Sequence, residues 1–249
     1  YFCSNNNKTD YNFVTPGDAW DENSNRAHWK HRRECQPFFS VFNYVKTHES
    51  QLWNSRDFEN THPEQLSEDE YQDPDKMEVP CIYPDTDAVR KDFARLFERI
   101  TQFDHFVKEK LDELKRAGLY EDTIVFIWSD HGNGLSRAKR WLYDTGTLSP
   151  LMIRVPEKFR RDGMPGAGGV ESKLVNFIDL GPTAVDLAGL KAADHMQGRS
   201  IFSGEERKYI FGARQRIDER FDMVRSVRDD RYRYVRNFYP EEPYFAHVG

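Results

Sequence analysis

An uninterrupted apolar run over residues 123–128 constrains the fold more than any other feature of this sequence. The run follows residues 88–117, where apolar side chains recur at steps of three and four. Gly118 then stands as a C-cap, so this pattern predicts a long amphipathic helix. A short apolar run without alternation is typical of a strand that is covered on both faces. The sequence therefore predicts a helix followed by a central strand, the repeating unit of α/β proteins.

Other segments continue this alternation of strands and helices. Residues 37–45 and 151–155 are short apolar runs that predict buried strands, and residues 180–187 predict a helix. Residues 1–36 predict loops with short elements, and the acidic residues 50–86 predict a long surface excursion. We expect an α/β fold in which a mostly parallel sheet is flanked by helices on both faces.

The last part of the chain changes character and predicts a small antiparallel sheet. It contains three short apolar or alternating runs, over residues 209–213, 223–228 and 231–235. The acidic pair Asp229 and Asp230 separates the last two runs and predicts a tight hairpin turn. We expect residues 1–205 to form the α/β domain and residues 206–249 to begin a smaller, β-rich lobe.

Composition excludes some classes of partner. The 249 residues carry a formal net charge of -6, with no basic stripe for nucleic acid and no polybasic cluster for an anionic membrane. No apolar run approaches the roughly 20 residues that a membrane-spanning helix needs. Cys3, Cys35 and Cys81 are an odd number without metal-ligand spacing, so they predict neither a disulfide framework nor a zinc site.

The most informative motif is Ser129-Asp130-His131-Gly132, which comes directly after the predicted strand at 123–128. In open parallel sheets, ligands bind outside the carboxyl ends of the strands. Asp130 offers an oxygen ligand, His131 a nitrogen ligand, and Gly132 lets the backbone turn sharply. These residues could hold a divalent cation, but the spacing alone is weak, and an ordinary turn capped by Asp130 is the alternative.

The residues after this motif carry a resemblance to a known family. Lys139 is followed by Trp-Leu-Tyr-Asp-Thr-Gly-Thr over residues 141–147, and Ser149-Pro150 leads into the next predicted strand. The order of apolar strand, Ser-Asp-His-Gly, Lys, aromatic-Asp-x-Gly-Thr and Pro before a strand resembles the type I sulfatases of the alkaline phosphatase superfamily. Within that family, the sequence is most similar to the bacterial branch related to N-sulfoglucosamine sulfohydrolase.

Further segments match this family in the same order. Lys8-Thr9-Asp10-Tyr11 stands in the place of the family's Gly-Lys-Trp-His motif. Thr47-His48 follows a strand similar to the one that ends in a catalytic-site His. Residues 175–190 and 195–200 resemble the helix and the segment after the family's Gly-rich loop. The resemblance therefore spans nearly all of the chain.

The resemblance implies a role for five residues in the hydrolysis of sulfated sugars. Sulfate ester hydrolysis requires negative charge to be neutralised on the sulfuryl group and on the departing oxygen. By their place in the motifs, Asp130 and His131 would be metal ligands, and Lys139 would contact the sulfate and the leaving oxygen. His48 would bind and could protonate the leaving group, and Lys8 would be a second sulfate contact.

Each of these roles has a plainer alternative. Lys139 and Lys8 could be ordinary solvated lysines, and His48 at a strand end could cap a backbone carbonyl. The implied metal is calcium, and because His131 is a softer ligand than the family's usual Asn, manganese or another transition metal stays open. The family implies a sulfated glycosaminoglycan or algal polysaccharide as substrate and a periplasmic, secreted or lysosomal location. The oligomeric state is left open.

The family's nucleophile has no counterpart in this chain. It is a formylglycine made from the Cys or Ser of a Cys/Ser-x-Pro/Ala-x-Arg motif, and none of the three cysteines has the required Arg. The family's N-terminal acidic metal ligands are missing too, and Asp10 stands where the family offers His. We expect the nucleophile to lie upstream, since the sequence begins with neither an initiator Met nor a signal peptide.

Two other functions remain open at this point. A phosphodiester or phosphonate ester hydrolase of the same superfamily would use a similar metal site. A noncatalytic fragment or pseudoenzyme would keep the fold and bind sugars without turnover.

We predict that the purified 249-residue chain by itself releases no sulfate from sulfate monoesters or N-sulfated sugars. The reason is that the chain lacks the nucleophile motif and the acidic metal ligands that precede the Lys8 segment in the family. Measurable sulfatase turnover by the chain alone would contradict this prediction.

Overall fold

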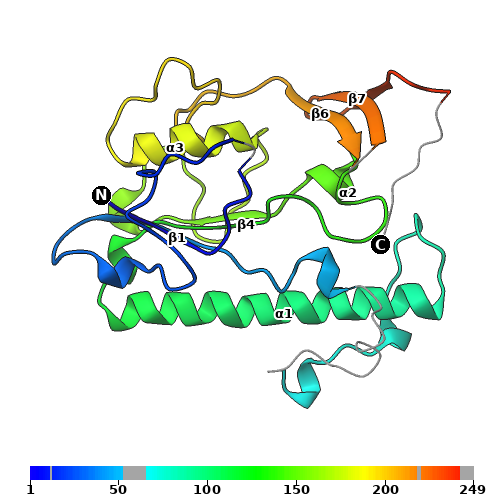
Figure 1. Ribbon diagram of the computed structural model, residues 1–249, viewed down its shortest axis with the longest axis horizontal. Coiled ribbons are helices and arrows are strands. Elements are labelled where there is room, and N and C mark those ends of the chain that lie inside the picture. The colour runs from blue at the N-terminus through cyan, green and yellow to red at the C-terminus, as the bar shows by residue number, and fades with distance from the viewer. Residues whose placement is uncertain (12, 53–65, 218–219, 242–249) are drawn as a thin grey trace. The chain divides into compact units, whose positions relative to one another are not determined.

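The computed structural model describes residues 1–11, 13–52, 66–217 and 220–241 and divides the chain into two units. The first unit is Tyr1–Lys110 and the second is Leu111–Gly249. Helix α1 (Asp87–Arg116) is the longest element and includes residues of both units (Figure 1). In the described part of the chain, no helix has the length and apolar character that a bilayer crossing requires.

The first unit contains a three-stranded parallel sheet in the order β2-β1-β3. Its strands are β1 (Phe2–Asn6), β2 (Glu22–Asn23) and β3 (Phe38–Phe42). Strand β3 confirms the strand expected at 37–45, and its register with β1 pairs Ser4 with Ser40. Parallel pairing also agrees with the expected α/β class.

The central strand β1 was not predicted, because its residues were interpreted as part of a loop region. Its Ser4 and Asn5 are 1% and 2% exposed, although both are polar. The Ser4 and Ser40 hydroxyls lie 2.6 Å apart and share a hydrogen bond, and the Asn5 amide is bonded to three groups of the same sheet edge. Buried polar groups with partners are stable in a core, so a strand of this composition escapes any search for apolar periodicity.

Helix α1 confirms the helix that was expected at 88–117. Phe93, Ala94 and Leu96 on its buried face are 6%, 3% and 8% exposed. Within the first unit, Tyr44 lies against two aromatic side chains of α1, with ring centroids 5.6 Å from Phe103 and 5.0 Å from Phe106. Burial raises the pKa of the Tyr44 hydroxyl.

The second unit contains the pair β4 (Val125–Trp128) and β5 (Leu151–Arg154) and the helices α2 (Asp144–Thr147) and α3 (Leu180–Leu187). These strands and α3 confirm the elements predicted in those places. However, β4 and β5 pair antiparallel, with Trp128 opposite Leu151. Because β5 runs opposite to β4, the connection between the two strands begins and ends at the same end of the pair, and no crossover helix is needed. Trp128 is 39% exposed, so the expectation of a strand covered on both faces is wrong at its end.

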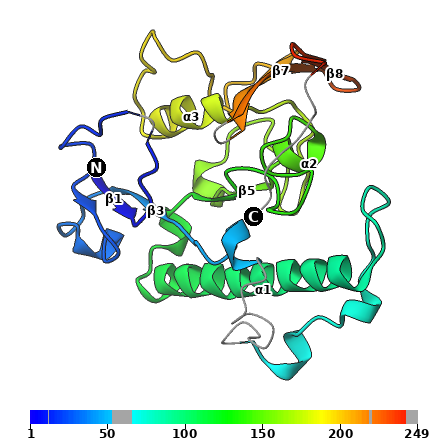
Figure 2. The same ribbon diagram turned by 45° about the vertical axis from the view of Figure 1, so that its right-hand side comes forward.

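The C-terminal sheet has the order β6-β7-β8 and is antiparallel throughout (Figure 2). Its strands are β6 (Ile210–Ile217), β7 (Arg220–Arg228) and β8 (Arg233–Asn237). The expected acidic turn is confirmed, because the Asp229 carboxylate accepts hydrogen bonds from the backbone amides of Arg231 and Tyr232 at 2.9 and 2.5 Å. The domain boundary between residues 205 and 206 stays a prediction.

Short 3-10 helices complete the described chain. They are η1 (Trp29–His31), η2 (Glu49–Gln51), η3 (Glu68–Glu70), η4 (Pro74–Lys76), η5 (Tyr120–Asp122), η6 (Glu157–Phe159) and η7 (Phe177–Asp179). The acidic excursion expected at 50–86 therefore has local helical turns at both η3 and η4, while its residues 53–65 lie outside the described part.

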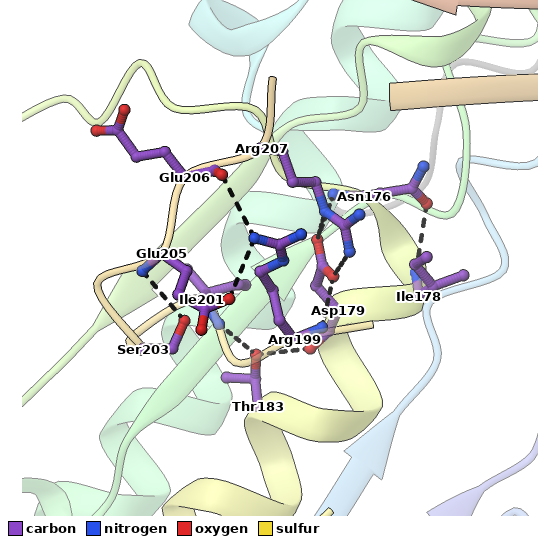
Figure 3. A network of polar contacts seen from close by, with 10 residues as sticks. All are labelled: Asn176, Ile178, Asp179, Thr183, Arg199, Ile201, Ser203, Glu205, Glu206 and Arg207. Carbon is purple, nitrogen blue, oxygen red and sulfur yellow. Dashed lines mark hydrogen bonds and ion pairs between the residues drawn. The ribbon is translucent and has the colours of Figure 1, made fainter. Parts of the chain in front are cut away.

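A buried carboxylate, Asp179, joins the segments before and after α3 (Figure 3). It is 2% exposed and accepts hydrogen bonds from the backbone amides of Asn176 and Arg199, both at 2.9 Å. The Arg207 guanidinium completes its shell, with Nε 3.0 Å from Oδ2 and Nη2 bonded to Oδ1. Burial by itself raises the pKa of Asp179, but the bonds from Arg207, Arg199 and Asn176 outweigh it and hold this pKa below its usual value.

We expect Asp179→Asn to lower the free energy of unfolding by about 3–5 kcal/mol at neutral pH, because it leaves the buried Arg207 uncompensated. The folded-state pKa of Asp179 is depressed, so its contribution is complete above the ordinary aspartate pKa of about 4 and is lost as pH falls through the lower folded value. Urea unfolding at pH 7 and pH 3 should show a difference between wild type and variant that shrinks at pH 3.

The control for this prediction is Asp194→Asn. The Asp194 side chain is 97% exposed and lies 3.6 Å from Lys191, so the substitution should change stability by less than about 0.5 kcal/mol. A loss at Asp179→Asn no larger than that of the control would contradict the role of the buried pair.

Candidate functional site

In the first unit, two of the predicted site residues follow strands of the parallel sheet. Lys8 comes shortly after β1, and His48 comes after β3. These strands run parallel, so their carboxyl ends lie at the same edge of the sheet, the place where ligands bind in α/β folds. The sheet therefore brings the Lys8 and His48 segments to one edge.

A network of asparagine side chains holds the backbone at this edge. The Asn5 side-chain amide donates to the Lys8 carbonyl at 2.8 Å and to Asn23 Oδ1 at 3.0 Å. In turn, Asn5 Oδ1 accepts from the Asn43 side chain at 3.0 Å, and Asn43 also donates to the Asn6 carbonyl at 2.9 Å. The network ties the ends of all three strands together and fixes the backbone at Lys8. No periodicity or motif in the sequence predicts this network.

The Lys8 ammonium lies 3.6 Å from Asp10 Oδ2. The two side chains are 38% and 82% exposed, and an ion pair that is so open to water adds little stability. Asp10, which stands where the family offers His, thus balances the charge of Lys8 in part. The Lys8 side chain keeps access to solvent, as a residue that contacts a substrate anion requires.

His48 is the N-cap of η2. Its Nδ1 accepts a hydrogen bond from the backbone N–H of Ser50 at 3.2 Å and lies 2.9 Å from the Ser50 hydroxyl. A nitrogen that accepts from an amide carries no proton, so the neutral ring carries its proton on Nε2. The η2 turn therefore orients a neutral His48 ring with an Nε2–H that can donate a hydrogen bond.

In the second unit, the Ser129-Asp130-His131-Gly132 motif forms a closed turn at the end of β4. The Ser129 hydroxyl donates to the His131 carbonyl at 2.6 Å, and the Ser129 amide donates to the Pro150 carbonyl at 3.2 Å. These bonds fix the turn between the end of β4 and the start of β5. The side chains of Asp130 and His131 are therefore attached to a backbone segment that these hydrogen bonds hold in place.

The donor atoms of Asp130 and His131 are arranged as two ligands of one cation would be. His131 Nε2 lies 3.7 Å from Asp130 Oδ1, a separation that a cation with ligand distances of about 2.0–2.6 Å bridges. His131 Nδ1 lies 2.5 Å from the Gly132 carbonyl, to which it donates, and metal-ligating histidines commonly donate their other ring N–H in this way. Asp130 and His131 could supply two ligands of a metal site but do not complete one, and no cluster of three or more potential ligands occurs among the described residues.

Lys139 lies on a loop that is joined to this turn by backbone contacts. The Lys139 amide donates to the Asn133 carbonyl at 3.0 Å, and the Gly132 amide donates to the Gly146 carbonyl at 3.0 Å. A Cβ at Gly132 would collide with the Thr145 carbonyl. The two motifs are therefore in direct backbone contact, while the joint roles of Asp130, His131 and Lys139 stay a prediction.

The loop that carries Lys139 departs from ordinary backbone geometry. Arg137 and Arg140 have φ angles of 62° and 75°, which non-glycine residues adopt at a cost. Trp141 and Tyr143 stack with ring centroids 6.0 Å apart and an interplanar angle of 6°. Gly146 faces the loop so closely that a Cβ there would collide with the carbonyls of Ala138 and Trp141. Packing contacts, and not the local backbone preferences of its residues, therefore maintain the conformation of the loop.

The comparison with known proteins places these residues in a family. A model of the sulfatase family matches residues 4–190, a range that includes all five predicted site residues. An ulvan-active sulfatase of Formosa agariphila is 36% identical, over all of this chain and 45% of its own length. Human N-sulphoglucosamine sulphohydrolase is 30% identical, over 69% of this chain and 36% of its own length.

A solved structure shows the same fold. It is a complex of a protein with its substrate D-glucosamine-2-N,6-O-disulfate, and it superposes with a TM-score of 0.53 at 20% identity, over 64% of this chain and 35% of that one. This chain thus spans less than half the length of the relatives and the structure that it matches. The α/β class is confirmed, with its parallel sheet, helices and C-terminal antiparallel sheet. The chain belongs to the sulfatase family.

Proposed function

We propose that this protein hydrolyses sulfuric esters of sulfated sugars. The observation that carries the proposal is the direct contact between the Asp130–His131 turn and the Lys139 loop, in a chain that belongs to the sulfatase family. That backbone contact joins the segment with two potential metal ligands, at the carboxyl end of β4, to the loop that carries the Lys139 ammonium. A site that must neutralise an anion as it reacts needs this combination of charges.

Each proposed role follows from the charge that develops when a sulfate ester is cleaved. The S–O bond breaks, and negative charge grows on the departing oxygen while the sulfuryl oxygens keep theirs. The Lys139 ammonium would contact the sulfate and the departing oxygen and stabilise both charges. Lys8 would supply a second sulfate contact. His48 would donate a hydrogen bond from Nε2–H to the leaving oxygen, and in its imidazolium form it would protonate that oxygen and return to the neutral ring.

The proposed metal is a divalent cation held by Asp130 and His131 together with ligands that this pair alone does not supply. Calcium is favoured by the carboxylate, while the imidazole keeps manganese or another transition metal open. A bound cation would add Lewis-acid stabilisation to the sulfuryl oxygens. The nucleophile is proposed to be a formylglycine from a segment outside this sequence.

The proposed substrate class is a sulfated carbohydrate. The relatives carry names that refer to ulvan and to N-sulphoglucosamine, and the solved relative holds a disulfated glucosamine. A phosphodiester or phosphonate ester hydrolase is not favoured, because the names of the matched relatives refer to sulfated substrates.

We expect Lys139→Ala and Asp130→Ala each to lower kcat/KM for a sulfate monoester on the order of 100- to 1000-fold in a full-length version of the protein. Each substitution removes one electrostatic stabiliser of the transition state, and such losses have this size. The assay should compare sulfate monoesters, N-sulfated sugars and phosphodiesters, with Ca²⁺ and Mn²⁺ added in turn.

Lys191→Ala is the matched control for these variants. The Lys191 side chain is 90% exposed, so the activity of the Lys191→Ala variant should stay within about twofold of wild type. Unchanged rates in the Lys139 and Asp130 variants would refute the assigned roles. Faster turnover of phosphodiesters than of sulfate esters would replace the proposed function with the alternative.

A further inference from the structure

We infer that three arginines of the C-terminal sheet, Arg214, Arg228 and Arg233, are positioning residues for the loop that carries Lys139. This inference rests on the proposed function for its catalytic consequence, but the contacts themselves do not. The C-terminal sheet lies beside α2, the short helix at the end of this loop (Figure 1 and Figure 2). All of the residues concerned belong to the second unit.

Arg214 of β6 holds the loop one residue after Lys139. Its Nη1 donates to the Arg140 carbonyl at 2.9 Å, and its guanidinium carbon lies 5.0 Å from the centre of the Trp141 ring. The side chain is 5% exposed, and its Nη2 is bonded to the carboxylate of Asp222 on β7. A planar guanidinium with several donors can make these contacts together, so Arg214 connects the loop backbone to two strands of the sheet.

Arg233 of β8 holds the loop two residues further on. Its Nη1 donates to the Leu142 carbonyl at 2.7 Å, and its Nη2 lies 2.7 Å from Asp144 Oδ1. Arg228 of β7 donates to the same carboxylate oxygen. The side chains of Arg233 and Arg228 are 17% and 27% exposed, so both ion pairs are partly shielded from water. Asp144 is the first residue of α2, and these arginines fix where that helix begins.

The packing of Leu142 strengthens this attachment. Leu142 is 8% exposed, and its Cδ2 lies so near Gly212 of β6 that a Cβ added there would be 3.3 Å from it. The sheet thus contacts three consecutive stretches of the loop: the Arg140 carbonyl, the Leu142 side chain and carbonyl, and the Asp144 carboxylate.

The loop needs such external contacts because its own geometry is unfavourable. The φ angle of Arg140 is 75°, a conformation that costs a non-glycine residue on the order of 1–3 kcal/mol and persists only when its surroundings impose it. The Arg214 bond is made by the carbonyl of this same residue. The sheet therefore stabilises the strained conformation that sets the direction of the preceding residue, Lys139.

The test uses Arg233→Met in the full-length protein, because Asp144 is 60% exposed and keeps Arg228 as a partner. Hydrogen exchange of peptides that cover residues 138–147 should become faster. The kcat/KM for a sulfate ester should fall on the order of 100-fold, the effect of displacing a catalytic group by about 1 Å. Arg233→Lys, which keeps the charge but has a single donor nitrogen, should recover part of both losses.

A double substitution separates positioning from general damage. In a Lys139→Met background, Arg233→Met should cause less than about a twofold further loss, because the residue it positions is gone. The matched control is Arg236→Met on the same strand, whose guanidinium lies over Phe238 and does not bond the loop. Arg236→Met should change neither the hydrogen-exchange rate of these peptides nor kcat/KM by more than about twofold.

The outcomes are distinct. The inference would be overturned if Arg233→Met left the hydrogen-exchange rate over residues 138–147 unchanged. It would also be overturned if Arg233→Met lowered kcat/KM as much in the Lys139→Met background as in the wild type. If the unsubstituted protein has no sulfatase turnover, the proposed function fails, and the exchange measurement still decides whether the arginines hold the loop. If Arg233→Met does not fold, Asp144→Asn, which weakens the same ion pairs at an exposed carboxylate, should give faster exchange in the same peptides, and no change would refute the inference.

Discussion

The candidate site of the second unit depends on one backbone contact, the hydrogen bond from the Gly132 amide to the Gly146 carbonyl. Neither glycine leaves room for a side chain. A Cβ at Gly132 would collide with the Thr145 carbonyl of the loop, and a Cβ at Gly146 would collide with the carbonyls of Ala138 and Trp141 in its own loop. Close approach of two backbones is a use for which only glycine serves. Through this contact the turn with Asp130 and His131 and the loop with Lys139 become one structure, although residues 133–138 separate them in the chain.

Polar groups hold the functional segments of both units. Asn5 binds three groups at the edge of the parallel sheet, Asp179 binds Arg207 and two backbone amides, and Arg214 binds Asp222 and the Arg140 carbonyl. All of these bonds are directional and are made by buried or half-buried groups. Apolar contacts tolerate sliding, whereas a buried hydrogen bond is costly to break. Such networks are therefore suited to fixing the positions of charged residues that must meet an anion.

The site was predictable where chemistry and spacing are local. Ser129-Asp130-His131-Gly132 follows an apolar strand directly, and the structure places it at the end of β4, as the sequence predicted. The loop with Lys139 was recognised from its motif. The arginines that hold it were not, because Arg214 and Arg233 are far from Lys139 in the chain, and an arginine on an alternating strand is normally a solvated residue. The Asn5 network was missed for the same reason, since no pattern marks an asparagine as buried.

The sequence by itself determined the elements whose signal is local. The three- and four-residue period predicted α1, the short apolar runs predicted β3, β4 and β5, and the acidic pair predicted the turn before β8. Only the tertiary structure decided that polar β1 is the central strand of its sheet and that β4 and β5 pair antiparallel. Helix periodicity and turn chemistry act over a few residues, whereas strand pairing and the burial of polar groups depend on partners that are distant in the chain. The residues proposed for the site therefore come from the sequence, and the contacts that hold their segments in place come from the fold.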